Sequence, residues 1–248
     1  MAVGEFEAAI DDLNNAIEME PCNPRNSFNR AMAILSLLSH TNAQHAGKSL
    51  FVLTKQQREQ DEALSLRAVK DLSRVIDLEP ENLEALCNRG TLFGIRNEFE
   101  KAIKDYTTAL TMPAITPDMA ARVRFNRASA YRAIGDRAGA IQDYSAVVDH
   151  GVPDSGEKEQ VCMACVHLAT LEAEQGNQAH ALKAIQSALA IDPSFAPVRT
   201  TPSVYRCASP HSLWRCVAYR LLRGRPAGKL TNDSKSYNDA RKRHPFLK

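Results

Sequence analysis

One pattern of apolar and polar positions recurs along this chain. In its clearest copy, residues 99–110, the apolar Ala102, Ile103, Tyr106, Ala109 and Leu110 are separated by polar and charged residues. Apolar residues at these intervals lie on one face of a helix. Similar copies span residues 8–17, 68–76, 140–148 and 181–189. The pattern therefore predicts one amphipathic helix repeated along the chain, and such repetition is typical of a solenoid.

The alanine that opens each copy gives the interval of the repeat. Ala68 and Ala102 are 34 residues apart, whereas the interval from Ala9 to Ala68 is 59 residues. The next two intervals, to Ala140 and to Ala181, are 38 and 41 residues. Because each unit must still stack its helices on the next, we expect the extra residues to lie in loops.

Three further marks accompany this helix. A small residue stands in the core of a preceding helix at Ala31, Gly90, Ala128 and Ala169. Glycine or asparagine, which tolerate the left-handed conformation, precedes the copies at Gly4, Asn97, Gly135 and Gly176. Proline follows some copies, at Pro21, Pro80 and Pro193. With these marks and the 34-residue interval, the chain resembles the tetratricopeptide repeat (TPR) family from about residue 1 to 193.

The resemblance implies an all-α fold, a TPR helix-turn-helix solenoid (an α-α superhelix) followed by an irregular basic C-terminal tail. It divides the chain into a partial unit with only a second helix, four units, a capping or amphipathic segment, and a basic disordered tail. These segments are 1–23, 24–82 (with an insertion at about 40–62), 83–116, 117–155, 156–193, 194–225 and 226–248.

Two departures from the repeat concern the first half of the chain. The opening helix has no first helix before it, so its apolar stripe, Phe6, Ile10, Leu13 and Ile17, is expected to lack a cover. A shortened product explains this more simply than a binding face does. In the insertion, residues 35–38 are expected to prolong a helix, 40–48 to form a polar loop, and 54–67 to form a charged extension of the next helix.

The net charge of +2 hides an asymmetry between the repeats and the tail. Residues 194–248 hold 12 Lys or Arg and two Asp or Glu, so the remainder of the chain carries a balance of −8. Leu213, Trp214, Val217, Ala218 and Leu221 would share one helical face in this tail. That face suits either a helix that caps the solenoid or a basic amphipathic segment for nucleic acid or acidic membrane.

The composition and the N-terminal residues favour a cytoplasmic protein. No signal peptide or apolar stretch long enough to span a membrane occurs in the sequence. Most cysteines are far apart, which argues against a disulfide framework. The basic run Arg241-Lys242-Arg243 makes the nucleus the alternative location.

By resemblance, side chains of the first helices line a concave peptide-binding groove. The residues that we expect to contact a ligand are Asn29, Asn88, Arg122, Phe125, Asn126, Arg132 and His167. An asparagine amide can both donate to and accept from an extended peptide backbone. The arginines that follow three of the asparagines, Arg30, Arg89 and Arg127, are instead expected to pair with the aspartates Asp12, Asp71, Asp105 or Asp143 of the second helices.

Some TPR domains hold the C-terminal carboxylate of chaperones in a clamp of lysine, asparagine and arginine. Asn29 and Asn88 match its middle position, but Glu84 and Asn88 stand where the following cations belong. The clamp is incomplete in every register, which argues against chaperone tails as partners.

No motif predicts an enzyme, a metal or another cofactor. Gly47-Lys48-Ser49 ends like a phosphate-binding loop, but Asn42 replaces the required earlier glycine. Cys162 and Cys165 have the spacing of metal ligands, yet they fall at packing positions of a predicted helix. The sequence therefore predicts a non-catalytic scaffold that holds a peptide or helix of a protein partner. The alternatives are an adaptor that binds nucleic acid or acidic membrane through its tail, and a tail that folds back and inhibits binding.

Overall fold

The computed structural model describes residues 3–45, 55–152 and 158–195. The chain divides into two units, residues 1–207 and 208–248, and only the first contains described residues. The segments predicted at 194–225 and 226–248 lie outside the described residues, apart from Ser194 and Phe195.

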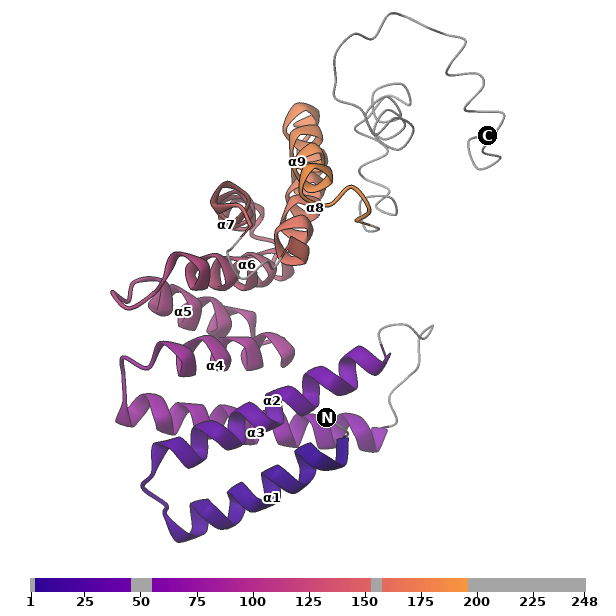
Figure 1. Ribbon diagram of the computed structural model, residues 1–248. Coiled ribbons are helices and arrows are strands. Elements are labelled where there is room, and N and C mark those ends of the chain that lie inside the picture. Colours follow the sequence, from indigo (N-terminus) through magenta and orange to yellow (C-terminus); the bar gives the residue numbers. More distant parts are fainter. Residues whose placement is uncertain (1–2, 46–54, 153–157, 196–248) are drawn as a thin grey trace, which may run out of the picture. The chain divides into compact units, whose positions relative to one another are not determined.

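Every regular element of the described residues is an α-helix (Figure 1). The helices are α1 (Val3–Met19), α2 (Pro24–His45), α3 (Lys55–Leu78), α4 (Leu83–Ile95), α5 (Phe99–Leu110), α6 (Pro117–Ala133), α7 (Arg137–His150), α8 (Lys158–Glu174) and α9 (Gln178–Ile191). The all-α solenoid fold that the sequence predicts is confirmed.

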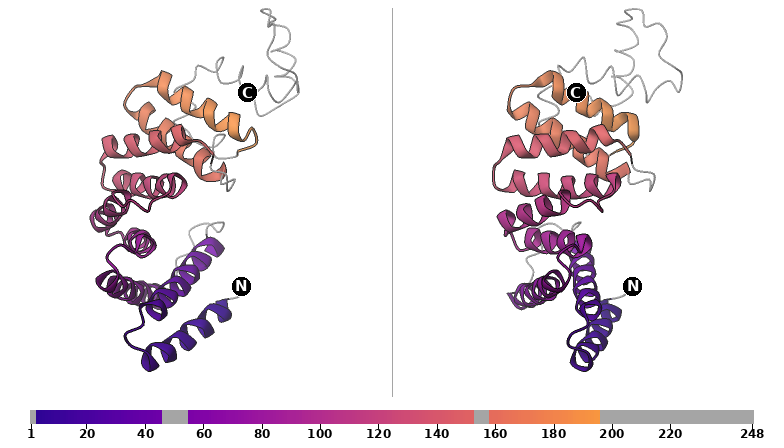
Figure 2. Two further views of the ribbon diagram at one scale, coloured as in Figure 1. Left: turned by 60° about the vertical axis from the view of Figure 1, so that its left-hand side comes forward. Right: turned by 90° about the vertical axis from the view of Figure 1, so that its left-hand side faces the viewer.

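Each helix packs mainly against the helices before and after it in the chain, as Figure 2 shows from two further sides. Weaker contacts join α2 to α4, α4 to α6 and α6 to α8. We call α2, α4, α6 and α8 the first helices, and α1, α3, α5, α7 and α9 the second helices. The first helices therefore follow one another along a single side of the described array.

Local signals set the helix ends. Asn82 and Asp136 cap α4 and α7, since their side chains accept hydrogen bonds from the amides of Ala85 and Gly139 at 2.9 and 3.0 Å. The turns between paired helices have positive φ at Asn97 (59°), Gly135 (83°) and Gly176 (84°). These are three of the four positions where the sequence predicts a left-handed turn.

The core consists of the repeated apolar positions. Ala68, Ala102, Ala140 and Ala181, which open the second-helix copies, are all buried. Gly90 in α4 shows why a small residue recurs in the first helices, because a Cβ there would lie 2.7 Å from the ring of Tyr106. Close backbone approach at this position brings the two helices of a pair together.

The prediction of a polar loop from His40 is wrong at its beginning, because α2 continues to His45. Leu37 and Leu38 are buried just before this point, and the hydroxyl of Thr41 donates to the carbonyl of Leu38 at 3.0 Å. Helix α3 begins at Lys55, so the predicted charged extension is helical from that residue. Residues 46–54 lie outside the described residues.

The expectation that the apolar stripe of α1 lacks a cover is also wrong in part. Ile10 is buried and Phe6 packs with it in a core that includes Ile34 and Leu38 of α2. Leu13 and Ile17 are half-buried. Helix α2, the next helix along the chain, supplies this cover.

Candidate peptide-binding face

Three arginines of the first helices form ion pairs inside the array. The guanidinium groups of Arg30, Arg89 and Arg127 each donate two hydrogen bonds to one carboxylate, at 2.6–2.8 Å. The partners are Asp71, Asp105 and Asp143, on the second helix that follows in each case. The predicted structural pairing is therefore confirmed for these arginines, which makes them part of the fold.

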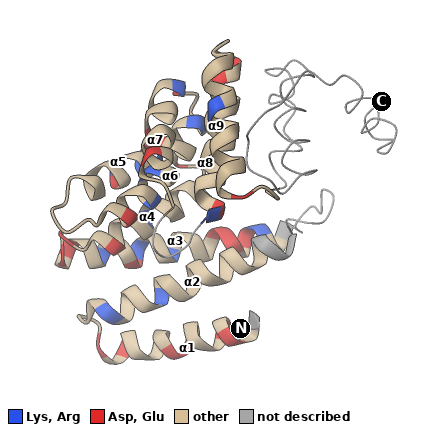
Figure 3. Cartoon of the chain, turned by 45° about the horizontal axis from the view of Figure 1, so that its top comes forward, with Lys and Arg blue, Asp and Glu red and all other residues tan. Residues whose placement is uncertain are grey.

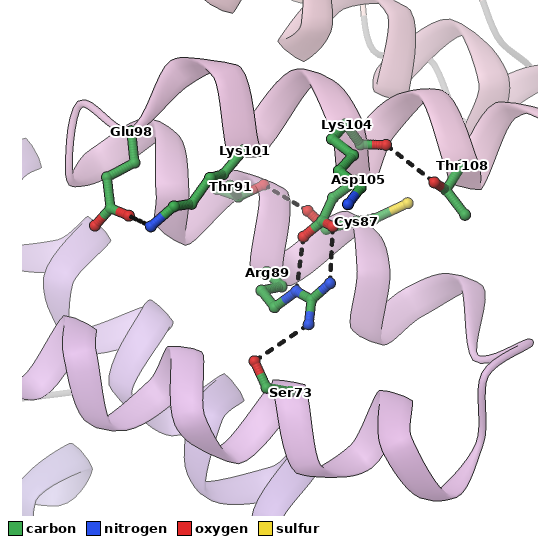
Figure 4. A network of polar contacts seen from close by, with 9 residues as sticks. All are labelled: Ser73, Cys87, Arg89, Thr91, Glu98, Lys101, Lys104, Asp105 and Thr108. Atoms are coloured by element: carbon green, nitrogen blue, oxygen red, sulfur yellow. Dashed lines mark hydrogen bonds and ion pairs between the residues drawn. The ribbon is translucent and has the colours of Figure 1, made fainter.

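The remaining terminal nitrogen of each arginine reaches backward along the array. Nη1 of Arg89 donates to the hydroxyl of Ser73 in α3 at 3.2 Å (Figure 4). Nη1 of Arg30 and of Arg127 donate to the side chains of Asn14 and Thr107, each at 3.0 Å. One guanidinium group thus joins two second helices and the first helix between them.

The helix pair α8–α9 carries apolar residues at the positions of this ion pair. Leu168 stands where the other first helices have arginine, and Ala184 stands where the second helices have aspartate. Both are buried. The arginine and the aspartate are therefore replaced together, which leaves neither charge unpaired in the core.

The structure brings three of the predicted ligand-contacting residues together on α6 and α8. Nη1 of Arg132 lies 2.7 Å from Nδ1 of His167, and the ring centroid of Phe125 lies 6.3 Å from that of His167. Tyr144 of α7 packs beneath them, with ring centroids 5.7 Å from Phe125 and 5.3 Å from His167. We call Phe125, Arg132, Tyr144 and His167 the α6–α8 cluster.

The imidazole of His167 is neutral near pH 7. Burial and the adjacent charge of Arg132 lower the pKa of His167 to about 4. Because arginine only donates, Nδ1 must accept this hydrogen bond and Nε2 carries the proton. The guanidinium group of Arg132 therefore supplies the positive charge of the cluster.

The other predicted residues lie at separate points on the first helices. The amide of Asn88 donates to the sulfur of Met32 at 3.1 Å, so it spans α4 and α2. Asn126 lies near the hydroxyl of Tyr106, whose pKa burial raises to about 12. Arg122 is exposed near Cys87, where its charge partly offsets the burial that raises the pKa of that thiol to about 11. Asn29 is exposed on α2.

We call the side of the array formed by α2, α4, α6 and α8 the first-helix face. The residues described above give this face a definite chemistry. Arg132 uses one of its five N–H groups on His167, which leaves donors for a carboxylate or a peptide carbonyl. Phe125 and the imidazole ring add half-buried aromatic surface beside this cation. The arrangement can bind a chain that offers hydrogen-bond acceptors next to apolar side chains.

Comparison with known proteins identifies a family that part of this array resembles. The family model of the tetratricopeptide repeat matches residues 87–155, which include α5, α6, α7 and most of α4. No curated protein matches the sequence. Tetratricopeptide repeats are in general protein-interaction scaffolds whose stacked helices present extended binding surfaces.

Solved structures share the fold of this helical array at low sequence identity. The crystal structure of MamA covers 78% of this chain and 92% of its own, with a TM-score of 0.57 and 16% identity. A MamA RS-1 double mutant covers 77% and 87%, with a TM-score of 0.58 and 17% identity. BtubC (BKLC) from P. vanneervenii covers 94% and 97%, with a TM-score of 0.52 and 13% identity. At these identities the likeness shows the fold alone.

The tyrosines of the second helices are the functional residues that sequence reasoning missed. Tyr106 and Tyr144 occupy one repeat position, four residues after Ala102 and Ala140, and both are buried. Their hydroxyls bond first-helix hydroxyls, Tyr106 to Thr91 at 3.2 Å and Tyr144 to Ser129 at 2.9 Å. Their recurrence at one position was the signal that could have identified them as supports for the first-helix face.

The cysteine pair of α8 belongs to the core of the array. Cys162 and Cys165 are buried, and Sγ of Cys162 lies 3.6 Å from the carbonyl oxygen of Ala188 in α9. Burial raises the pKa of Cys165 to about 12. Within the described ranges, no group of three potential metal ligands occurs and no helix is long and apolar enough to cross a membrane.

Proposed function

We propose that this chain is a non-catalytic scaffold that holds a peptide or helix of a protein partner on its first-helix face. The observation that carries the proposal is the α6–α8 cluster, in which an exposed arginine and a neutral histidine stand beside half-buried aromatic surface. Asn88 and Asn126 extend the polar surface along α4 and α6. The tetratricopeptide match over residues 87–155 includes most of α4 and all of α6 and α7, which carry most of these residues.

The ion pairs separate arginines that stabilise the fold from an arginine that can contact a ligand. Arg30, Arg89 and Arg127 are bound by aspartates within the fold, whereas Arg132 is exposed and its described contact is to the imidazole of His167. A ligand carboxylate or carbonyl can therefore approach Arg132 without breaking an internal ion pair. We accordingly expect partner segments that carry acidic or backbone acceptors beside an apolar residue.

The test is capture of partners from a lysate by the full chain and by two variants of the face. Asn88→Ala/Asn126→Ala and Arg132→Gln/His167→Asn should each lose the partner. Lys104→Gln, which removes an exposed charge from the second helix α5, is the matched control and should retain it. Retention of the partner by both face variants would contradict the proposal.

A form that ends at Ala196 separates this function from the alternative in the tail. If the tail binds nucleic acid or acidic membrane, this form loses its partner, and binding by the full chain falls steeply with salt. Binding on the first-helix face should survive the truncation and depend less on salt. Improved binding after truncation would instead support the inhibitory tail.

A further inference from the structure

Helix α6 carries two exposed arginines on one side, and the helices drawn in blue and red in Figure 3 show how charged residues are spread over the array. Arg122 and Arg132 are ten residues apart, and Phe125 and Ser129 lie between them. Because a helix advances about 1.5 Å and turns about 100° per residue, the arginines are about 15 Å apart along the axis. All four residues lie within an arc of about 80°, and we call them the α6 row.

The middle of the α6 row offers apolar surface. The hydroxyl of Ser129 donates to the carbonyl of Phe125 at 3.1 Å, so the serine uses its only hydroxyl proton inside the array. The hydroxyl of Tyr144 lies 2.9 Å from the same oxygen. The ring of Phe125 is half-buried and packs against the rings of Tyr144 and His167. A ligand group above this part of the row therefore meets an aromatic ring, which favours an apolar side chain.

Each end of the α6 row supplies one positive charge. Nη1 of Arg132 donates to Nδ1 of His167 at 2.7 Å, and that imidazole is neutral. At the other end, the charge of Arg122 lowers the pKa of the Cys87 thiol against the effect of burial. At the two repeat positions of these arginines, the other first helices have Arg25 and Leu35, Glu84 and Gly94, and Met163 and Ala173. Among the four described first helices, α6 alone has a positive charge at both positions.

A carboxylate suits each end of the row. A guanidinium group binds a carboxylate through two parallel hydrogen bonds, whereas a phosphate carries nearly two negative charges and neutral His167 adds no second cation for it. An extended chain advances about 3.3 Å per residue, so carboxylates four or five positions apart can reach both arginines. The amide of Asn126, next to Phe125, can bond the backbone of an extended segment, while a helix satisfies its backbone internally.

We propose that the α6 row binds an extended peptide segment with two acidic side chains four or five positions apart and an apolar side chain between them. One carboxylate bonds Arg122, the other bonds Arg132, and the apolar side chain packs on Phe125. This inference rests on the proposed function and deepens it, because it assigns the chemistry of the partner and its course along α6. Neither arginine requires a terminal carboxylate, so segments inside a partner chain fit the row.

The probe is a fluorescein-labelled peptide of serines with two aspartates separated by three residues, the middle one a leucine. Titrated with the full chain, it should show saturable fluorescence anisotropy. Arg122→Gln and Arg132→Gln should each weaken binding about threefold to tenfold, since each removes a charge-assisted pair. Replacement of one aspartate of the peptide by asparagine should cost about as much, and should add little to the loss in the variant that lacks its partner arginine.

Arg124→Gln is the matched control, because Arg124 is an arginine of the same helix that points about 120° away from the centre of the α6 row. It should leave the affinity unchanged, and circular dichroism should show each variant to be folded. A peptide with adjacent aspartates should bind more weakly than the probe, because it can reach one arginine at a time.

The proposal is overturned if no saturable binding occurs or if either arginine variant of the row binds the probe like the unchanged chain. It is also overturned if Arg124→Gln weakens binding equally, because general attraction to positive charge then explains the result. In the lysate capture, retention of the partner by Arg122→Gln and its loss from Asn88→Ala/Asn126→Ala would overturn this inference and leave the proposed function standing. Retention by every variant of the first-helix face would contradict both.

Discussion

At the scale of single residues, the arginine that forms an ion pair inside the array is the most informative side chain. Arg127 keeps its guanidinium group charged inside the array because Asp143 and the hydroxyl of Thr107 satisfy it, and the pKa of Arg127 is raised by its hydrogen bonds to Asp143. Desolvation of both charges offsets most of their attraction, so such a pair adds little net stability. Removal of one partner is a different matter, since the other charge then remains buried.

Asp143→Ala is therefore expected to lower the free energy of unfolding by about 3–5 kcal/mol, the usual cost of breaking a buried ion pair. The double change Arg127→Leu/Asp143→Ala reproduces the residues of the α8–α9 pair, Leu168 and Ala184, and should recover most of that loss. Denaturant titration of both variants measures the difference. A double variant no more stable than Asp143→Ala would show that the charges themselves stabilise the unit.

His167 gives the array a dependence on pH. Its pKa is about 4 in the fold against about 6.5 in the unfolded chain, so the unfolded chain binds more protons between these values. The free energy of unfolding should thus fall by about 2 kcal/mol as the pH drops from 6.5 to 4. Thermal unfolding over this range should show a smaller fall for His167→Asn.

The control for that measurement is His180→Asn, which removes an exposed imidazole of α9 outside the α6–α8 cluster. An equal reduction of the pH dependence in the two variants would contradict the role assigned to burial of His167.

At the scale of elements, the turns decide where the helices of a pair separate. Gly135 has a φ of 83° between α6 and α7, a conformation that side chains with a Cβ disfavour. Gly94 lies inside α4 without positive φ, and a Cβ there would meet no atom within 4 Å. The two glycines therefore differ in backbone conformation while both have space for a methyl group.

Gly135→Ala is expected to destabilise the array by about 1 kcal/mol, whereas Gly94→Ala is expected to stabilise it by about 0.5–1 kcal/mol through helix propensity. Midpoints of urea unfolding measure both changes. Opposite signs are the expected result, and destabilisation by Gly94→Ala would show that α4 requires an open surface at this residue.

At the scale of the whole array, the strong contacts join helices that are neighbours in the chain. In such a structure, the stability of a helix depends on its own packing and on the adjacent interfaces. Helix α5 packs extensively against both α4 and α6, while α1 has its extensive contact with α2. Local opening should therefore differ between these two second helices.

We expect the amides of α1 to exchange with solvent at least about tenfold faster than those of α5, because fewer contacts must break for α1 to open. Hydrogen exchange read by mass spectrometry measures both helices in one experiment. Equal protection of α1 and α5 would contradict this expectation.

The repeat made much of this fold predictable from the sequence. The pairing of Arg89 with Asp105 could be inferred because both residues return at fixed places in several copies. The helical run from His40 to His45 was missed because it lies outside the periodic pattern and follows from burial of Leu37 and Leu38. Nor could the sequence predict that Tyr144 supports His167, since that contact depends on how α7 packs against α8.

The backward hydrogen bond of each arginine bears on how such a chain can change in length. Loss of residues 83–116 would bring Arg127 opposite Ser73 in place of Thr107, one hydroxyl for another, and Asp143 would remain its ion-pair partner. Gene rearrangements that remove or duplicate a unit therefore restore the same hydrogen bond between neighbouring units without any compensating mutation. Such a deletion would instead affect ligand recognition, because it removes Asn88 together with helix α4.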